Sequence, residues 1–258
     1  MHTLKDKIVF ITGASLGIGR SCAYACAAQG AHLIISSRRE EAIAHVAEDI
    51  RTKHGVRVHG LELDVRDRHA VTTAVAALPE DWRCVDILIN NAGLVRGLAP
   101  LWLGDFDDWD QMIDTNVKGL LYVTHALVPG MIERNSGHVI NIGSIAGQEA
   151  YPNGSVYNAT KFAVDGITKA LRMELVDTPL RVSTVDPGLV ETNFSVTRFY
   201  GDEERAGKVY EGIQPCTPDD VADAVVYCAT RPPHISINQI VLMPTAQASA
   251  TIVHRDSR

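Results

Sequence analysis

Residues 7–19 read KIVFITGASLGIG, and this stretch decides the fold. Its first six residues are mostly apolar and β-branched, which predicts a buried strand. Gly13, Gly17 and Gly19 punctuate the turn that follows, and a helix is expected from Ile18 onward. Glycines at such a turn let backbone amides approach an anion, and a helix N-terminus adds partial positive charge. The spacing is Gly-x-x-x-Gly-x-Gly and no Gly-Lys-Ser/Thr follows, so the stretch predicts a dinucleotide turn and not a P-loop.

Apolar runs recur along the chain and alternate with helix-like segments. The expected strands are residues 7–12, 32–36, 57–63, 85–90, 138–142, 181–185 and 239–243. The expected helices are residues 18–29, 40–54, 67–77, 109–134, 155–176 and 218–230. Alternation with right-handed crossovers predicts an α/β fold, a single-domain, doubly wound parallel sheet over residues 1–258 with strand order 3-2-1-4-5-6-7. Residues 192–218 lack clear strand or core-helix character, which favours a mobile flap over a site or a solvated helical excursion.

The composition excludes several classes of protein. The chain has 258 residues, of which 46% are apolar and 21% charged, as in ordinary globular proteins. Its net charge of −7 and the absence of a basic block argue against nucleic acid as a partner. The sequence contains no membrane-span-length apolar stretch and no signal peptide, so we expect a cytoplasmic protein without a membrane partner. Five scattered cysteines predict no metal site, and Cys22 and Cys26 are expected to pack on the sheet and not to form a metal or disulfide pair.

The end of the second strand indicates which dinucleotide binds. Residues 36–39 read SSRR, where an NAD enzyme is expected to carry an acidic residue for the ribose hydroxyl. Arg38 and Arg39 instead suit a 2′-phosphate, because an arginine fork gives charge-assisted bidentate bonds. We therefore predict NADP as the cofactor. Asp64, at the end of the third strand, is placed to bond the adenine amino group, or else to cap the helix that follows from Asp67.

Tyr157 and Lys161 carry the chemistry that we expect. They are four residues apart, so on a helix they lie on the same face. A tyrosine with its ordinary pKa of about 10 is a poor acid or base at neutral pH, and a neighbouring ammonium favours the phenolate. A shift of ~2–3 units takes about 3–4 kcal/mol, which one close cation in a partly desolvated cleft can supply. Taken alone, such a pair is typical of a solvated helix surface, so its context decides the interpretation.

That context is a set of motifs that covers nearly the entire chain. The motifs are TGASLGIG at 12–19, Asp64, NNAG at 90–93, Asn116, Ser144, YNATK at 157–161 and Pro187-Gly188. Together and in this order they resemble the short-chain dehydrogenase/reductase family. The resemblance implies a Rossmann-type sheet and hydride transfer, in which the nicotinamide supplies the chemistry and the protein supplies placement and charge stabilisation.

The resemblance assigns a role to each of four catalytic residues. Tyr157 is the general acid/base on the substrate oxygen, and Ser144 hydrogen-bonds that oxygen. Lys161 binds the nicotinamide ribose and lowers the pKa of Tyr157, while Asn116 uses a helix irregularity and a water to connect Lys161 to solvent. The motifs and the resemblance together predict the following cofactor-binding residues: Gly13, Ser15, Leu16, Gly17, Ile18, Gly19, Arg38, Arg39, Asp64, Val65, Asn91, Ala92, Gly93, Tyr157, Lys161, Pro187, Gly188, Val190 and Thr192.

A narrower resemblance appears in the last third of the chain. Tyr151-Pro152, GLVET at 188–192, VTRF at 196–199 and PTAQ at 244–247 look like the NADP-dependent 3-hydroxy acid dehydrogenases, also described as serine or L-allo-threonine dehydrogenases. This resemblance implies oxidation of the 3-hydroxyl of a short hydroxy acid, or reduction of the 3-oxo acid.

Such a substrate has a carboxylate about two carbons from the reacting carbon, so a cation or an amide is expected near Tyr157. Arg198 is the first candidate, because a guanidinium binds a carboxylate bidentately. Gln148 and Arg96 are further candidates. For each of the three the alternative is a surface salt bridge or a loop contact.

Two other functions fit the same motifs. Carbonyl reductases of uncharged ketones, sugars or 3-oxoacyl thioesters use the same fold. A cofactor-sensing binding protein would keep the glycine-rich turn but has no need for Ser144, Tyr157 and Lys161 together. Family members are commonly tetramers, which implies a homotetramer that pairs the helices around 109–134 and 155–176, although their apolar residues also fit packing on the sheet. The tail at 248–258 is expected to cover a neighbour's site or to be disordered.

Overall fold

The computed structural model describes residues 3–256, which form a seven-stranded sheet. The strands are β1 (Ile8–Thr12), β2 (His32–Ser37), β3 (Val58–Glu62), β4 (Ile87–Asn90), β5 (His138–Ile142), β6 (Arg181–Pro187) and β7 (Gln239–Leu242). Their order is β3-β2-β1-β4-β5-β6-β7, and each neighbouring pair is parallel. The predicted strand order is therefore confirmed.

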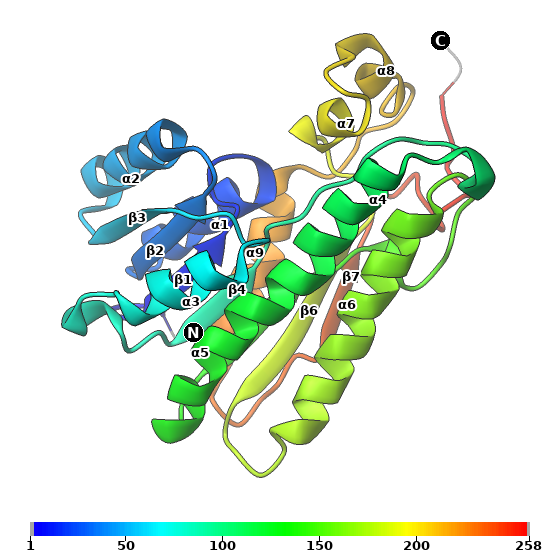
Figure 1. Ribbon diagram of the computed structural model, residues 1–258. Coiled ribbons are helices and arrows are strands. Elements are labelled where there is room, and N and C mark those ends of the chain that lie inside the picture. Colours follow the sequence, from blue (N-terminus) through cyan, green and yellow to red (C-terminus); the bar gives the residue numbers. More distant parts are fainter. Residues whose placement is uncertain (1–2, 257–258) are drawn as a thin grey trace.

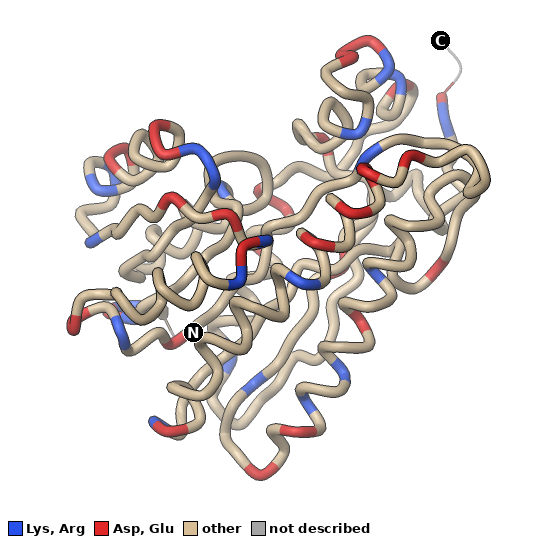
Figure 2. The backbone as a smooth tube through the Cα atoms, in the orientation of Figure 1, with Lys and Arg blue, Asp and Glu red and all other residues tan. Residues whose placement is uncertain are grey.

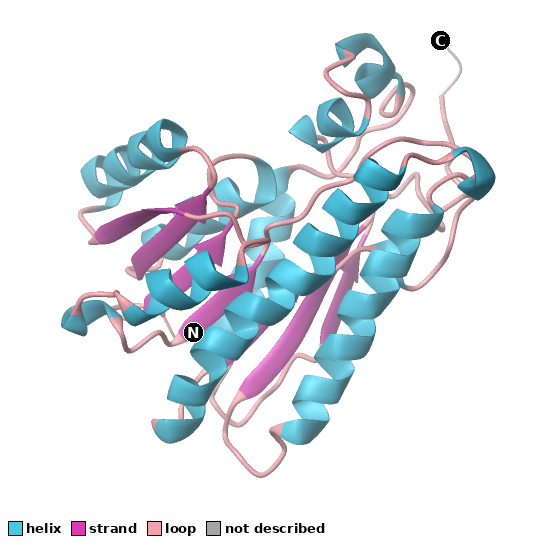
Figure 3. Cartoon of the chain, viewed as in Figure 1, coloured by secondary structure: helices cyan, strands magenta, loops and turns pink. Residues whose placement is uncertain are grey.

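Helices cover both faces of the sheet (Figure 3). The longer ones are α1 (Gly17–Ala28), α2 (Glu40–His54), α3 (Arg68–Ala76), α4 (Phe106–Ile113), α5 (Leu120–Glu133), α6 (Ser155–Glu174) and α9 (Pro218–Ala229). Alternate residues of β1 explain why both faces are apolar. Val9 and Ile11 join a buried cluster with α1, α2 and α9, while Ile8 and Phe10 join a second cluster with α3 and α5. The carboxyl ends of the strands therefore meet at one edge between two helical layers.

The helix predicted over residues 109–134 is present, but it starts earlier than predicted and contains a π-helical stretch. Helix α4 begins at Phe106, because the Asp105 side chain accepts a hydrogen bond from the Asp107 amide and caps it. A π-helical stretch, η3 (Asp114–Gly119), then separates α4 from α5. Such bulges are frequent at functional sites. Pro129 lies inside α5 and does not end it.

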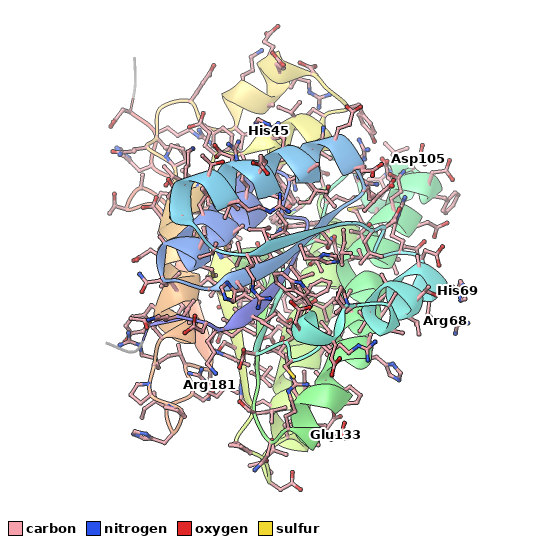
Figure 4. The ribbon with its side chains drawn as sticks, turned by 90° about the vertical axis from the view of Figure 1, so that its left-hand side faces the viewer. His45, Arg68, His69, Asp105, Glu133 and Arg181 are labelled. Carbon is pink, nitrogen blue, oxygen red and sulfur yellow. The ribbon has the colours of Figure 1, made fainter. Side chains whose placement is uncertain are left out.

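The segment 192–218 forms two short helices, α7 (Asn193–Arg198) and α8 (Glu203–Lys208). Figure 1 shows them projecting beyond the carboxyl ends of the strands, and in Figure 4 the labelled Arg181 and Glu133 lie at the opposite end of the molecule. Of the tail, residues 248–256 are described, and they lie against this segment of the same chain. Arg255 donates a 3.0 Å hydrogen bond to the Val209 carbonyl, and the Asp256 amide donates to Gly212. The described part of the tail therefore contacts its own chain, both expectations for the tail stay predictions, and its last two residues lie outside the described range.

The distribution of charged residues and the burial of two cysteines agree with the sequence analysis. Acidic and basic residues are interspersed along the backbone (Figure 2). Cys22 and Cys26 are fully buried in the core and neither is in a disulfide, as predicted. Within residues 3–256, every helix is too short or too polar to cross a membrane.

Candidate active site

A cavity of about 530 Å³ opens at the carboxyl ends of the strands and is bounded by α7. It brings together segments that are far apart in the chain. Of the predicted site residues, those that line it are Gly13, Leu16, Gly17, Ile18, Asn91, Ala92, Gly93, Ser144, Tyr157, Lys161, Pro187, Gly188, Val190, Thr192 and Arg198. Those that do not line it are Ser15, Gly19, Arg38, Arg39, Asp64, Val65, Arg96, Asn116 and Gln148.

The glycine-rich turn is packed tightly against the NNAG segment. Gly13 has a φ of +67°, and a Cβ there would lie 2.9 Å from Ala92 Cα. At Gly19 a Cβ would lie 2.3 Å from Asn91 Nδ2, which donates hydrogen bonds of 2.9 and 3.1 Å to the carbonyls of Thr12 and Gly13. The glycines thus let the turn adopt its shape and approach Asn91. The first amides of α1 have no side-chain cap, which leaves them available to an anion at the cavity wall.

The SSRR stretch leads into the N-terminus of α2. Arg38 and Arg39 are exposed, and Arg39 occupies the N-cap position without a side-chain hydrogen bond to the helix. The Ser37 hydroxyl bonds the Arg39 backbone, while the Ser36 hydroxyl is buried without a partner. Two exposed guanidiniums at an uncapped helix N-terminus are a fitting place for a phosphate.

Asp64 does not cap the helix after it. Asp67 caps α3 by accepting a 3.0 Å hydrogen bond from the Ala70 amide. The Asp64 carboxylate instead accepts hydrogen bonds from the Arg66 guanidinium and backbone amide. Burial acts to raise the pKa of Asp64, but the bonds from Arg66 outweigh it and the pKa is lowered. The sequence analysis missed Arg66, although an opposite charge two residues on is a local signal.

Tyr157 and Lys161 lie in the first turns of α6 and both face the cavity. Lys161 Nζ is 5.9 Å from the Tyr157 ring centroid and donates a 2.9 Å hydrogen bond to the Ile142 carbonyl. Burial lowers the pKa of Lys161 to about 8 and raises the pKa of Tyr157. The Ser144 hydroxyl and the Arg198 guanidinium act to lower the pKa of Tyr157, but less strongly. Burial therefore outweighs the Ser144 hydroxyl and the Arg198 cation, and the expectation that Lys161 lowers the pKa of Tyr157 stays a prediction.

Asn116 lies in the π-helical stretch η3, so the expected helix irregularity is present. Its side chain exchanges two 2.8 Å hydrogen bonds with the Leu94 backbone and donates a 3.0 Å bond to Thr160 on α6. Asn116 therefore ties the loop after β4 to the helix that carries Tyr157 and Lys161.

Gln148 and Arg96 do not line the cavity. Gln148 Nε2 donates a 2.9 Å hydrogen bond to Asp186 Oδ2, because the short helix η4 (Ile145–Gly147) turns the chain toward β6. Arg96 donates a 3.0 Å bond to the Thr197 carbonyl and stacks on Tyr200. The structure thus gives both side chains contacts within the protein and places neither in the cavity wall.

Arg198 ends α7 and reaches into the cavity. Its guanidinium carbon lies 5.8 Å from the Tyr157 ring centroid and 5.7 Å from that of Tyr151, to whose hydroxyl it donates a hydrogen bond. Its Nε is buried and has no partner. The Gly97 amide donates a 3.0 Å hydrogen bond to the Arg198 carbonyl, and this bond holds the end of α7 over the site. A cation with an unused buried donor beside a tyrosine is suited to an anionic group.

The sequence profile described as short chain dehydrogenase matches residues 7–202. The chain belongs to the short-chain dehydrogenase family. The NADP-dependent 3-hydroxy acid dehydrogenase YdfG of Salmonella typhi is 45% identical over 250 residues, covering 96% of this chain and 99% of that protein. The NADP-dependent 3-hydroxy acid dehydrogenase of Schizosaccharomyces pombe is 41% identical, with 99% of both chains covered. A solved closed form of serine dehydrogenase complexed with NADP+ superposes with a TM-score of 0.90 at 43% identity, covering 96% of this chain and all of that one.

Membership of the short-chain dehydrogenase family agrees with the strand order and with the motifs that converge on the cavity. The sequence analysis gave no role in the site to two of its neighbours, Tyr151 and Asp186. Tyr151 bonds Arg198, and Asp186 bonds Gln148 from the strand before Pro187-Gly188. Neither had a local signal, because each is brought to its partner by residues distant in the chain.

Proposed function

We propose that this protein is an NADP-dependent oxidoreductase of short 3-hydroxy acids, such as L-serine or L-allo-threonine. It transfers a hydride between the nicotinamide and the 3-hydroxyl or 3-oxo carbon. The activities for which the relatives are named support this assignment. The single observation that carries it is Arg198, which lines the cavity with its guanidinium carbon 5.8 Å from the Tyr157 ring centroid.

The residues present fit the dinucleotide. The close approach of Gly13 to Ala92 and the uncapped amides of α1 suit a pyrophosphate. Arg38 and Arg39 at the N-terminus of α2 would hold the 2′-phosphate, and Asp64 would face the adenine. The segment 187–192 would hold the nicotinamide end, near Lys161. When bound, the nicotinamide accepts or supplies the hydride.

The protein's own part in the reaction is proton transfer and placement. In the oxidation direction Tyr157 takes the proton of the substrate hydroxyl, and in reduction it returns one. The Ser144 hydroxyl, which lies close enough to act on the pKa of Tyr157, donates to the same substrate oxygen. Lys161 places an ammonium beneath the tyrosine, and Asn116 fixes the helix that carries both residues. Burial of Tyr157 and Lys161 keeps competing water from the reacting oxygen.

The substrate carboxylate would bind to Arg198. Its guanidinium sits between the rings of Tyr151 and Tyr157, so a carboxylate on it would place a carbon two bonds away near the Tyr157 hydroxyl. We further propose that the 192–218 segment closes over the substrate, since α7 carries this arginine.

The test is a panel of substrates with NADP+ and the purified protein, followed at the absorbance band of the reduced nicotinamide. L-serine, L-allo-threonine, 3-hydroxyisobutyrate and 3-hydroxypropionate are compared with uncharged secondary alcohols. Turnover of the acids supports the proposal. Turnover of uncharged compounds alone would favour the carbonyl reductase alternative, and no turnover with tight NADP binding would favour a sensor.

We also propose a homotetramer. Exposed apolar side chains on α4 to α6 support it, including Phe106 at 74% and Phe162 at 44% exposure. Light scattering that gives the mass of a single chain would contradict it.

A further inference from the structure

Asp186 is a buried carboxylate at the edge of the site, and the mechanism proposed above gives it no role. It is 3% exposed and directly precedes Pro187-Gly188 on β6. One oxygen, Oδ2, accepts hydrogen bonds from Gln148 Nε2 at 2.9 Å, Gln239 Nε2 at 2.6 Å and Thr184 Oγ1 at 3.2 Å. Three donors on one oxygen fix the carboxylate in a single orientation.

The other oxygen, Oδ1, points at the backbone beside Ser144. A Cβ added to Gly143 would lie 1.8 Å from Oδ1, closer than any real contact. Gly143 does not have a positive φ, so its backbone conformation does not call for glycine. The missing side chain is explained instead by the carboxylate that occupies its place. Asp186 is thereby brought up to the end of β5, whose Ile142 carbonyl accepts the hydrogen bond from Lys161.

The charges around this carboxylate point to Lys161. Burial raises the pKa of Asp186, while its three hydrogen bonds and the Lys161 ammonium act to lower it. In return, the charge of Asp186 raises the pKa of Lys161 against the effect of burial. Asp186 and Lys161 thus both contact the backbone of residues 142–143 at the end of β5.

We propose that Asp186 is a positioning residue of the reaction, the buried counter-charge that holds Lys161 as an ammonium ion beside Tyr157. It touches neither substrate nor cofactor and acts through Lys161. The inference rests on the roles proposed above for Tyr157 and Lys161. The competing explanation is that Asp186 only ties β6 to β7 and to the turn at Gln148.

The deciding variant is Asp186→Asn, which keeps the size of the side chain and leaves an oxygen for the three donors. Removing a negative charge lowers the pKa of every group near it, and Tyr157 and Lys161 titrate as a coupled pair. Both limbs of the pH profile of kcat/KM for hydroxy acid oxidation are therefore expected to move down by about 1 pH unit. The pH at which the Kd of NADP+ begins to rise is expected to move in the same direction, because that rise follows deprotonation of Lys161.

Gln239 offers matched controls, since its side chain is at the exposed end of the same network. Gln239→Leu removes a hydrogen bond to Asp186 but no charge, and its pH profile should stay where the wild-type profile is. Gln239→Lys places an ammonium next to Asp186 and offsets its charge, so its limbs should move down in pH relative to Gln239→Leu. If Asp186 has only a structural role, both Gln239 variants should lower the activity, and neither should shift the limbs of the pH profile.

The inference is overturned if a folded Asp186→Asn protein has wild-type limbs in both profiles. Should that variant not fold, coincident profiles of Gln239→Lys and Gln239→Leu overturn it. The proposed function fails separately, through hydroxy acids that are not oxidised or a Tyr157→Phe protein that turns over normally. The NADP+ binding profile does not depend on which substrate is used, so the two failures can be told apart.

Discussion

Replacing Arg198 by methionine removes the guanidinium and keeps most of the side-chain length, and its effect can be worked out from two contacts. The first is the contact that we expect between the cavity-lining guanidinium and the substrate carboxylate. Hydrogen bonds to a charged group contribute about 1.5–3 kcal/mol, so the KM for L-serine should rise ~10- to 150-fold.

The second contact is with Tyr157. The guanidinium carbon is 5.8 Å from its ring centroid, and the cation acts to lower the pKa of that tyrosine. Two charges at about 6 Å and an effective dielectric constant of about 20 interact by ~3 kcal/mol, so loss of the cation raises the pKa of Tyr157 by up to about 2 units. Less phenolate is then available for oxidation at neutral pH. We therefore expect kcat to fall as well, by up to ~100-fold.

The assay compares L-serine with 2-butanol at saturating NADP+. In Arg198→Met, kcat/KM for L-serine should fall by at least ~10-fold from the KM alone, and further by the factor that kcat loses; for 2-butanol it should fall only by the kcat factor. Arg205→Met is the matched control, because Arg205 lies on α8 of the same segment, stacks on Phe199 at 4.5 Å and does not line the cavity. An unchanged KM for L-serine in Arg198→Met would remove Arg198 from substrate recognition.

Three further predictions concern the cofactor, the core and the tail. Arg38→Asp should shift the ratio of kcat/KM for NADP+ over NAD+ by ~10- to 100-fold toward NAD+, and an unmoved ratio would refute the 2′-phosphate assignment. His138 is buried with Nε2 bonded to Ser183, and burial lowers its pKa well below the usual range. The unfolded chain takes up a proton on this histidine below pH about 6.5 and the folded chain does not, so the free energy of unfolding should fall by up to ~1.4 kcal/mol per pH unit below that value. In urea unfolding measured over this pH range, the free energy of unfolding of His138→Gln should fall less steeply with decreasing pH than that of the wild type. Equal slopes in the two proteins would show that His138 does not contribute. Arg255→Ala removes the hydrogen bonds from the tail to the carbonyls of residues 209 and 211, so the KM for substrate should rise about 5- to 10-fold. An unchanged KM would show that the tail does not stabilise this segment.

Much of the fold could be predicted because its causes are local. The glycines of residues 13–19, the apolar strands and the alternation with helices each show within a few residues, and the handedness of crossovers then sets the strand order. The same holds for Asn116, where the motif implied a helix irregularity and η3 provides one.

The parts that could not be predicted depend on contacts between distant residues. Gln148 follows Ser144 by four positions, yet its amide is drawn to Asp186, which is 38 residues away in the chain. The pKa of Tyr157 depends on how deeply packing buries the ring, and that burial outweighs the charges that spacing alone suggests. Arg198 could be named from its motif, but its seat between Tyr151 and Tyr157 follows from α7 being held by the loop after β4.

The most direct test of the central claim compares the wild-type protein with Tyr157→Phe, using NADP+ and L-serine at the reduced-nicotinamide absorbance band. The phenol is the proposed acid/base, so we expect turnover by the wild type and a kcat at least ~10³-fold lower in the variant. The Kd of NADP+ should stay within about threefold, since the ring and Lys161 remain. Equal turnover by the two proteins would contradict the account.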